Sequence, residues 1–272
     1  MSIVICPVCG EPLENNGRGL VCAKNHNFDF AKSGYVNLLL SKHIGKTVHG
    51  DNKLMVRARR EFLEKGYYAP LKDKLCSKAE QYFNGEVILD AGCGEGYYTT
   101  AIFDKLQSTG IAVKMYGIDI SKTAAEFAAK RKKEIFFAAA SVFHLPFASE
   151  SCDMLVTMFA PYCGNEYLRV LKKDGIMIMA IPSENHLWEL KKAIYDTPYK
   201  NQVKPYDLEG FTFTDKERIT YDMEIDNNED IQSLFSMTPY FYRTSPQQKE
   251  KLSALSSIFT KADFELLIYR KN

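Results

Sequence analysis

"GEVILDAGCGEGYYTTAIFDKL", residues 85–106, is the stretch that decides the fold of this 272-residue chain. It begins with a short apolar run that ends in an acid, and a turn with three glycines follows. An apolar run bounded by glycines indicates a buried strand, and the residues after the turn have helical spacing. Small turn residues let the backbone approach a ligand beside the N-terminus of the next helix. The stretch therefore predicts a ligand-binding unit of strand, turn and helix.

The acid in this stretch indicates which ligand the turn binds. A dinucleotide-binding turn would read G-x-G-x-x-G, whereas this one reads G-x-G-x-G after Asp90. A carboxylate at that place would repel a pyrophosphate and would suit a ligand that carries positive charge. We therefore expect S-adenosylmethionine (SAM), held by Asp90, Gly92, Gly94 and Gly96. The alternative is a plain turn that binds no ligand.

The rest of the chain continues the alternation of strand and helix. Helical patterns separate strand-like runs at 114–121, 135–141, 152–161 and 175–182, and a helix at 227–238 and a strand at 264–270 follow. Alternation over 85–182 predicts a parallel sheet covered on both faces. Asp119 ends the second strand, where an acid accepts ribose hydroxyls. The stretch "ASVFHLPFASESCD", residues 140–153, resembles the loop after the third strand of class I methyltransferases, and this resemblance implies an adenine contact at Ser141. Together these motifs predict an α/β fold, the class I (Rossmann-like) SAM-dependent methyltransferase fold.

A second motif lies near the N-terminus, in "CPVCGEPLENNGRGLVCAKNH", residues 6–26. It reads C-x2-C-x12-C-x3-H, so that Cys6 and Cys9 form one pair and Cys22 and His26 another. Three thiolates and an imidazole complete a closed tetrahedral zinc site, which is structural because no position stays open. A module this small needs such a staple. We predict a structural Zn²⁺ here, and the alternative is four unrelated residues.

Charge is unevenly distributed although the net charge is only +1. Residues 1–60 carry nine Lys and Arg against four Asp and Glu. A basic front is typical of a phosphate-rich partner, and a solvated face is the alternative. The basic run nearest the module consists of Lys42, Lys46, Lys53, Arg57, Arg59 and Arg60. We expect the last four of these to bind RNA phosphates, which position RNA without reading its sequence.

Three regions are expected along the chain. They are a zinc-binding module (1–34), a helical linker that forms the N-terminal part of the methyltransferase domain (35–83), and a class I methyltransferase domain (84–272). In the second region Asp51 is expected to cap a helix that Gly66 ends. Neither a signal peptide nor an apolar run long enough to span a bilayer is visible. We therefore expect a soluble, cytoplasmic protein that does not bind membranes, with its cysteines as thiols or metal ligands.

Several short motifs, taken together, resemble those of one family. They are "CPVC" (6–9), "FDFAKSGYVNLL" (28–39), "GDNKLMVRARREFLEKGYYAPL" (50–71), "LDAGCGEGYYT" (89–99), "LPF" (145–147), "FAP" (159–161) and "HLWELK" (186–191). Over essentially its whole length the chain resembles the RlmA/RrmA-type 23S rRNA (guanine-N1)-methyltransferases, including the tylosin-resistance branch. The resemblance implies SAM-dependent methylation of guanine N1 in a hairpin loop of 23S rRNA. It also implies a homodimer with a cleft for that hairpin.

The resemblance assigns roles to single residues as well. The family's cofactor contacts map to Tyr68, Gly94, Glu95 and His186. The complete set of residues that we expect at the cofactor is Tyr68, Asp90, Gly92, Gly94, Glu95, Gly96, Asp119, Ser141 and His186. The stretches "FAPYCGNEYL" and "KKDG" depart from the family's pattern, so the target guanine stays open.

The catalytic group is not assigned by the sequence. Guanine N1 carries a proton at neutral pH, so its methylation requires a proton acceptor. Phe159 and Tyr162 are candidates for stacking on an extruded base, and Glu166 is a candidate acceptor. The alternatives are core packing for the two aromatic residues and simple solvation for the glutamate.

Two other functions fit the same motifs. A small-molecule SAM-dependent methyltransferase could use the zinc module as a lid over its substrate, and it would show no salt-sensitive affinity for RNA. A zinc-ribbon adaptor with a vestigial methyltransferase fold would bind no cofactor.

Overall fold

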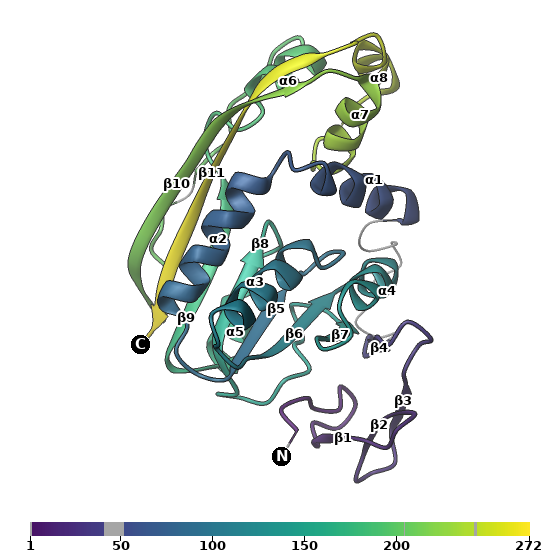
Figure 1. Cartoon of the computed structure of the whole chain (residues 1–272), viewed down its shortest axis with the longest axis vertical. Helices are drawn as coiled ribbons and strands as arrows, with labels where there is room; N and C mark the ends of the chain where they lie inside the picture. The colour runs from purple at the N-terminus through teal and green to yellow at the C-terminus, as the bar shows by residue number, and fades with distance from the viewer. Residues whose placement is uncertain (1, 41–51, 204, 242–243) are drawn as a thin grey trace.

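The structure is a computed structural model, which describes residues 2–40, 52–203, 205–241 and 244–272. Its centre is an eight-stranded sheet with the strand order β10-β11-β9-β8-β5-β6-β7-β4 (Figure 1). The strands are β4 (Val36–Asn37), β5 (Val87–Ala91), β6 (Lys114–Asp119), β7 (Phe136–Ala139), β8 (Cys152–Met158), β9 (Leu171–Pro182), β10 (Phe211–Ile225) and β11 (Ile258–Lys271). Strands β4 to β9 pair in parallel, which confirms the parallel sheet predicted for 85–182.

The last two strands are antiparallel. Strand β11, which the sequence predicts in part, pairs with β9, and β10 pairs with β11. The patterns do not predict β10, because charged residues such as Asp215 and Glu217 occupy some of its less exposed positions, so that apolar residues do not alternate regularly along the strand. The connection from β10 to β11 stays at one end of the sheet, so the two strands run in opposite directions.

Eight helices surround the sheet in the described part of the chain. They are α1 (Lys53–Glu64), α2 (Ala69–Tyr82), α3 (Tyr97–Ser108), α4 (Lys122–Arg131), α5 (Gly164–Val170), α6 (Trp188–Ile194), α7 (Asn228–Ser236) and α8 (Pro246–Ser253). Successive residues of the central strands enter separate cores on the two faces. Ile88 packs in the core that α1 to α4 cover, whereas Leu89 packs in the core that α5 shares with the N-terminal module.

The N-terminal module is a three-stranded sheet of β1 (Leu13–Asn15), β2 (Gly19–Cys22) and β3 (Asn27–Asp29). Its apolar side chains do not form a core of their own. Val4, Leu13 and Leu20 are buried in the same cluster as Phe147 of the methyltransferase part, and Val4 and Phe147 form a β-bridge. The module therefore takes the place of a helical layer on one face of the large sheet.

The boundaries of α1 follow from its capping groups. Asn52 is the N-cap, and its side chain accepts the N–H groups of Leu54 and Met55. The predicted cap, Asp51, lies outside the described residues, as do Lys42 and Lys46 of the basic run. Gly66 follows the last turn with a φ of +85°, which agrees with its predicted role as the residue that ends the helix.

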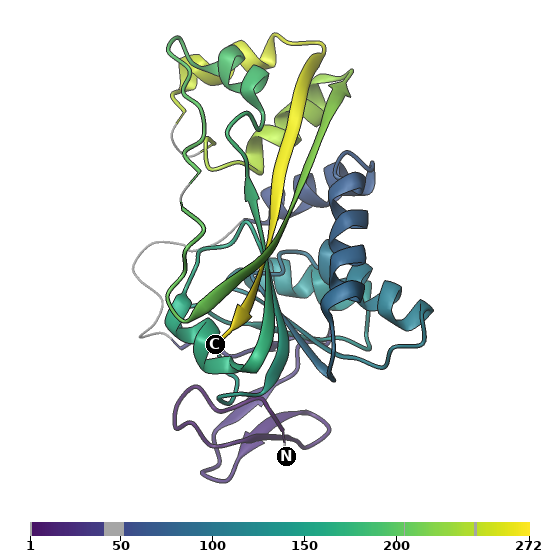
Figure 2. The same ribbon diagram turned by 90° about the vertical axis from the view of Figure 1, so that its left-hand side faces the viewer.

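Strands β10 and β11 form a long ribbon that carries a second lobe. Helices α7 and α8 lie between these strands in the chain, and α6 follows β9. Figure 2 shows that these three helices lie at one end of the molecule and the N-terminal module at the other. We call α6, α7, α8 and their connections the upper lobe. No helix among the described residues has the length and apolarity that crossing a membrane requires.

Candidate active site and zinc centre

The glycine turn lies at the carboxyl ends of β5 and β6. The N–H groups of Gly92 and Cys93 donate to the carbonyl of Ile118, at 2.9 and 2.8 Å. The N–H of Gly94 donates to Oδ2 of Asp119 at 3.0 Å, and Oδ1 of the same carboxylate accepts the N–H of Ser121. Asp119 therefore holds the turn while it lines the cavity described below.

The three glycines are required for different physical reasons. All have positive φ, at 93° for Gly92, 56° for Gly94 and 87° for Gly96. A Cβ on Gly92 would lie 2.4 Å from Cβ of Ala160, and one on Gly96 would lie 3.0 Å from Cβ of Ala128. Gly92 and Gly96 thus permit close packing, whereas a Cβ on Gly94 would come no closer than 3.7 Å to any atom and would enter the open space of the cavity.

Asp90 is a buried carboxyl, and it forms no ion pair with the residues that the structure describes. Its Oδ2 accepts the hydroxyl of Thr99 at 2.6 Å, while its buried Oδ1 has no hydrogen-bond partner. Burial raises the pKa of Asp90 to about 7. The hydrogen bond from Thr99 lowers this pKa, whereas the nearby charge of Asp119 raises it further. An acceptor that is prepared in this way fits a cationic ligand, because a positive charge would offset the cost of ionising it.

A cavity of about 990 Å³ opens beside the turn. It is large enough for a cofactor together with a substrate group, since ligand pockets span about 300–1,000 Å³. The predicted cofactor residues that line it are Tyr68, Asp90, Gly92, Gly94, Glu95, Asp119, Ser141 and His186. Gly96 does not line it and instead packs against α4. These residues fit SAM, since the turn, the orphaned oxygen of Asp90 and the acid at the end of β6 converge on one space.

His186 also lines this space, from the loop that follows β9. Its Nδ1 accepts the N–H of Asp263 at 3.2 Å, so the proton of the neutral ring is on Nε2. Burial lowers the pKa of His186 to about 3. The negative charge of Asp263 raises this pKa, whereas the positive charge of Lys191 lowers it further. The imidazole is therefore a neutral hydrogen-bond donor near the cavity. Its ring packs 4.4 Å from that of Phe264, and Phe264 packs 5.0 Å from Tyr68.

Glu95 has a partner that the sequence does not indicate. Its carboxylate is buried against the guanidinium of Arg131, which also donates to the Glu95 carbonyl at 3.0 Å. Arg131 extends from α4 and also pairs with Glu64 of α1 at 3.2 Å. Burial raises the pKa of Glu95, although Arg131 opposes this change. The ion pair thus ties the glycine turn to two helices.

The three catalytic candidates lie in different surroundings. Phe159 lines the cavity with 44% of its surface exposed, and its φ of +59° is strained for a residue with a side chain. Tyr162 does not line the cavity, and its ring packs 5.5 Å from that of Tyr167. Glu166 is also outside the lining, where it pairs with Arg169 at 2.7 Å and accepts the N–H of Leu145 at 2.6 Å. Arg169 lowers the pKa of Glu166, although burial opposes it.

The four residues of the basic run that the structure describes also lie in different surroundings. Lys53 and Arg57 are exposed on α1, whereas Arg59 lines the cavity, with its Nη1 the nearest atom to the space beside Gly94. Arg60 pairs with Glu64 at 3.0 Å and lies over the ring of Phe127. Lys53 and Arg57 are therefore the members of the run most open to a large partner.

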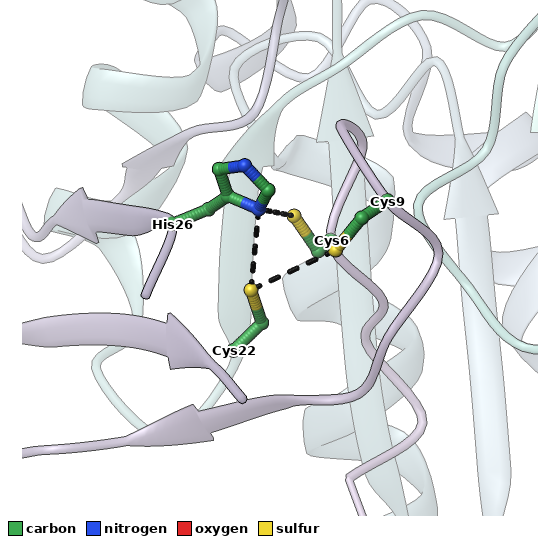
Figure 3. A group of neighbouring side chains, drawn as sticks. All are labelled: Cys6, Cys9, Cys22 and His26. Atoms are coloured by element: carbon green, nitrogen blue, oxygen red, sulfur yellow. Dashed lines mark hydrogen bonds between the residues drawn. The ribbon is translucent and has the colours of Figure 1, made fainter. Parts of the chain in front are cut away.

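The N-terminal cysteines and histidine converge as the spacing predicts (Figure 3). Sγ of Cys6 lies 3.5 Å and Sγ of Cys22 lies 3.3 Å from Nδ1 of His26. The Sγ atoms of Cys9 and Cys22 are 3.7 Å apart, and all four ligand atoms lie within 4.8 Å of one another. Around a tetrahedral zinc ion with bonds of about 2.0–2.3 Å, ligand atoms are about 3.5–3.8 Å apart. The donor set therefore fits a closed, structural zinc site.

The zinc module does not form a lid over the cavity. None of the residues 2–40 that the structure describes lines the cavity, which is bounded by α1, by the ends of the large sheet and by the upper lobe. The lid expected in the small-molecule alternative thus has no counterpart here.

Several lining residues are not predicted from the sequence. Phe143 is half exposed at the end of β7, and its place in "SVFHLPF" is the only signal that could have indicated it. Phe264 and the segments 199–202 and 237–240 also line the cavity. No local pattern distinguishes them, because they reach the cavity only through the path of β9 and the upper lobe.

Comparison with known proteins agrees with this geometry. A family model described as "RlmA, N-terminal", a zinc ribbon, matches residues 4–43, and a methyltransferase-domain model matches residues 83–237. The chain is 31% identical to YxjB of Bacillus subtilis, a proposed 23S rRNA (guanine-N1)-methyltransferase, over 99% of this chain and 98% of the relative. It is 35% identical to a proposed enzyme of the same kind from Micromonospora griseorubida, over 68% of this chain and 67% of the relative.

A third relative has a defined target. The chain is 31% identical to the 23S rRNA (guanine(748)-N(1))-methyltransferase of Streptomyces fradiae, over 70% of this chain and 66% of that enzyme. The match to the first relative extends over almost the full length of both proteins, so it includes the zinc module, the glycine turn and the upper lobe. The chain therefore belongs to the RlmA-type family of 23S rRNA (guanine-N1)-methyltransferases.

Proposed function

We propose that this protein transfers the methyl group of SAM to N1 of a guanine in a hairpin loop of 23S rRNA, so that the sulfur leaves as S-adenosylhomocysteine and the N1 proton is released. The observation that carries this proposal is the joint presence of a cavity beside an acid-bearing glycine turn and a four-ligand zinc cluster in one chain. Family membership over almost the whole length supports the same activity.

The turn side of the cavity holds the cofactor. When bound, SAM supplies a methyl group on a sulfonium that is already a good leaving group. Asp90 presents an oxygen without a partner to the positive end of the ligand. Asp119 keeps lone pairs for ribose hydroxyls after it accepts two backbone N–H groups, and Ser141 lies where the adenine is expected. Tyr68 and His186 also line the cavity, with Nε2–H of His186 as a fixed donor.

Positioning of the base is the main catalytic contribution of the protein. Alignment of N1 with the methyl carbon can supply about 7–11 kcal/mol, because it replaces an encounter with a preset geometry. Phe159 presents a half-exposed ring to the cavity and stacks on the extruded guanine. Its strained backbone is consistent with a side chain that is held for function.

RNA binding belongs to the surface outside the cavity. Lys53 and Arg57 bind phosphates, and the zinc module adds to the binding face. We further propose that the protein acts in the cytoplasm as a homodimer, as the family resemblance implies. The regions 1–34, 35–83 and 84–272 then correspond to the zinc module, the helical linker and the methyltransferase domain.

The test is methylation of a synthetic 23S rRNA hairpin with methyl-labelled SAM, followed by mass mapping of the modified nucleotide. We expect one methyl group on N1 of a single guanine. The matched control replaces that guanine with adenine, which has no N1–H. Methylation of a free metabolite without methylation of RNA would contradict the proposal and would favour the small-molecule alternative.

A further inference from the structure

Charge divides the cavity into two halves. The acids among its described lining residues are Asp90, Glu95 and Asp119, and all three belong to the turn side. The other half consists of the lining segments 158–161, 179–182, 199–202 and 237–240, whose described residues include no acid. These segments supply aromatic and apolar side chains together with the polar side chains of Lys200, Asn201 and Gln202. An acid-free, aromatic space suits an uncharged planar base that loses a proton during the reaction, whereas the acidic half suits a cation.

A lysine is buried directly behind this acid-free half. Lys191 of α6 has no exposed surface, although its ammonium is a charged group. Its Nζ donates to the Tyr199 carbonyl at 2.9 Å and to Oδ1 of Asn201 at 2.7 Å. The rings of Tyr199 and Tyr240 lie 4.6 and 4.9 Å from the same Nζ. Within the described residues, no carboxylate lies within ion-pair distance of this ammonium.

The contacts of Lys191 converge on one wall of the cavity. We call residues 199–202 the wall segment. Besides its bond from Lys191, Asn201 accepts the hydroxyl of Tyr240 at 3.1 Å and donates through Nδ2 to the Ser183 carbonyl at 2.8 Å. The N–H of Asn201 donates to the Glu184 carbonyl at 3.1 Å. The wall segment is thus joined to the end of β9 and to the upper lobe through one side chain.

A buried, unpaired ammonium is expensive, so its retention needs a physical reason. Burial alone lowers the pKa of Lys191, and an apolar residue would fill the same volume without that cost. What an apolar residue cannot do is donate two charge-assisted hydrogen bonds to a loop that has no secondary structure of its own. The charge therefore fixes the loop rather than the core.

We propose that Lys191 is a positioning residue for the target guanine, because it holds the wall segment in place around the acid-free half of the cavity. The residue contacts neither the base nor the cofactor and acts through Tyr199 and Asn201. That Lys191 holds the wall segment is a property of the free protein. That this hold positions the target guanine rests on the proposed function.

The test compares Lys191→Met with Lys192→Met in the full-length protein. Methionine keeps the length of the side chain but removes the donors. Lys192 is a half-exposed neighbour on the same helix, and among the described residues it pairs with Glu189 alone. In Lys191→Met, amide hydrogen exchange of the wall segment should be about tenfold faster, as expected when hydrogen bonds to a charged group are lost. The KM for the RNA hairpin should rise by a similar factor, while the affinity for SAM measured by calorimetry stays unchanged. Lys192→Met should behave as wild type in all three measurements.

A second variant covers the case in which Lys191→Met does not fold. Asn201→Ala removes the acceptor at the other end of the contact and should show the same faster exchange in the wall segment and the same rise in the KM for RNA. Unchanged exchange in the wall segment, or faster exchange with an unchanged KM for RNA, would overturn the inference. If the wild-type protein methylates no hairpin, the proposed function fails, and exchange together with SAM calorimetry still decides whether Lys191 holds the wall.

Discussion

Replacement of Asp90 by asparagine should make the free protein more stable and SAM binding weaker. The pKa of Asp90 is about 7 in the folded chain, against an ordinary value of 3.8. This difference of about 3 in pKa corresponds to a cost of about 4 kcal/mol for keeping the carboxylate ionised in the fold. Asparagine removes that cost, but its buried N–H groups lack an acceptor, which costs about 1–3 kcal/mol. The net gain in the free energy of unfolding is about 1–3 kcal/mol at pH 8.

The sign of the pH dependence follows from where the proton is bound. Between pH 4 and 7 the folded chain keeps a proton on Asp90 that the unfolded chain has released, so wild-type stability falls by up to about 1.4 kcal/mol per pH unit. The loss is complete above pH 7 and absent below pH 4. The stability difference between Asp90→Asn and wild type should therefore increase from pH 5 to pH 7 and then level off.

Urea unfolding at pH 5, 6, 7 and 8 without ligand measures this difference, and calorimetry at pH 8 measures the affinity for SAM. Asp153 provides the matched control, because Lys172 and the backbone N–H groups of Glu86 and Val87 lower the pKa of its carboxyl, although burial opposes them. Asp153→Asn should therefore destabilise the chain at pH 8. The reasoning would be refuted if Asp90→Asn were no more stable than wild type at any pH, or if it bound SAM as tightly.

Three further outcomes are expected. Cys22→Ser should lose zinc, measured by elemental analysis, and should speed amide exchange in the N-terminal module, because a structural site contributes folding energy directly; full zinc content would contradict the ligand set. Phe159→Ala should reduce kcat/KM for the hairpin by a factor that corresponds to about 1–3 kcal/mol, the range for one stacked base. Tyr162→Ala should reduce it clearly less, and equal losses would argue against stacking on Phe159. Arg57→Glu should weaken hairpin binding and lower the slope of log K against log salt by about one, whereas Lys114→Glu, an exposed change at the start of β6, should leave the slope unaltered.

Features that depend on neighbouring residues could be predicted from the sequence. The apolar run and glycines of 85–106 predict β5, the turn and α3, and the structure confirms all three. The Cys and His spacing predicts the cluster because a knuckle and a short hairpin determine the geometry locally. Because helical patterns separate the strands in the sequence, we predict that β5 to β9 run parallel to one another, and the structure confirms this direction.

Features that depend on distant segments could not be predicted. Nothing near Lys191 or Asn201 in the sequence indicates that they meet, since the contact requires the return of the chain over α6. Arg59 illustrates the same limit, because the basic run favours a phosphate contact while the fold brings Arg59 to the cavity wall. The pairing of Glu95 with Arg131 likewise needs α1, α4 and the turn in place.

Because the zinc module shares its core with the methyltransferase domain, loss of zinc would affect the folding of the whole enzyme. Because Val4, Leu13 and Leu20 complete the packing against Phe147, the module cannot be detached as an independent reader and grafted onto another enzyme without an apolar sheet face becoming exposed to water. A cell short of zinc would then lose the whole methyltransferase to aggregation or proteolysis, rather than keep an active enzyme that has only become less selective for its RNA.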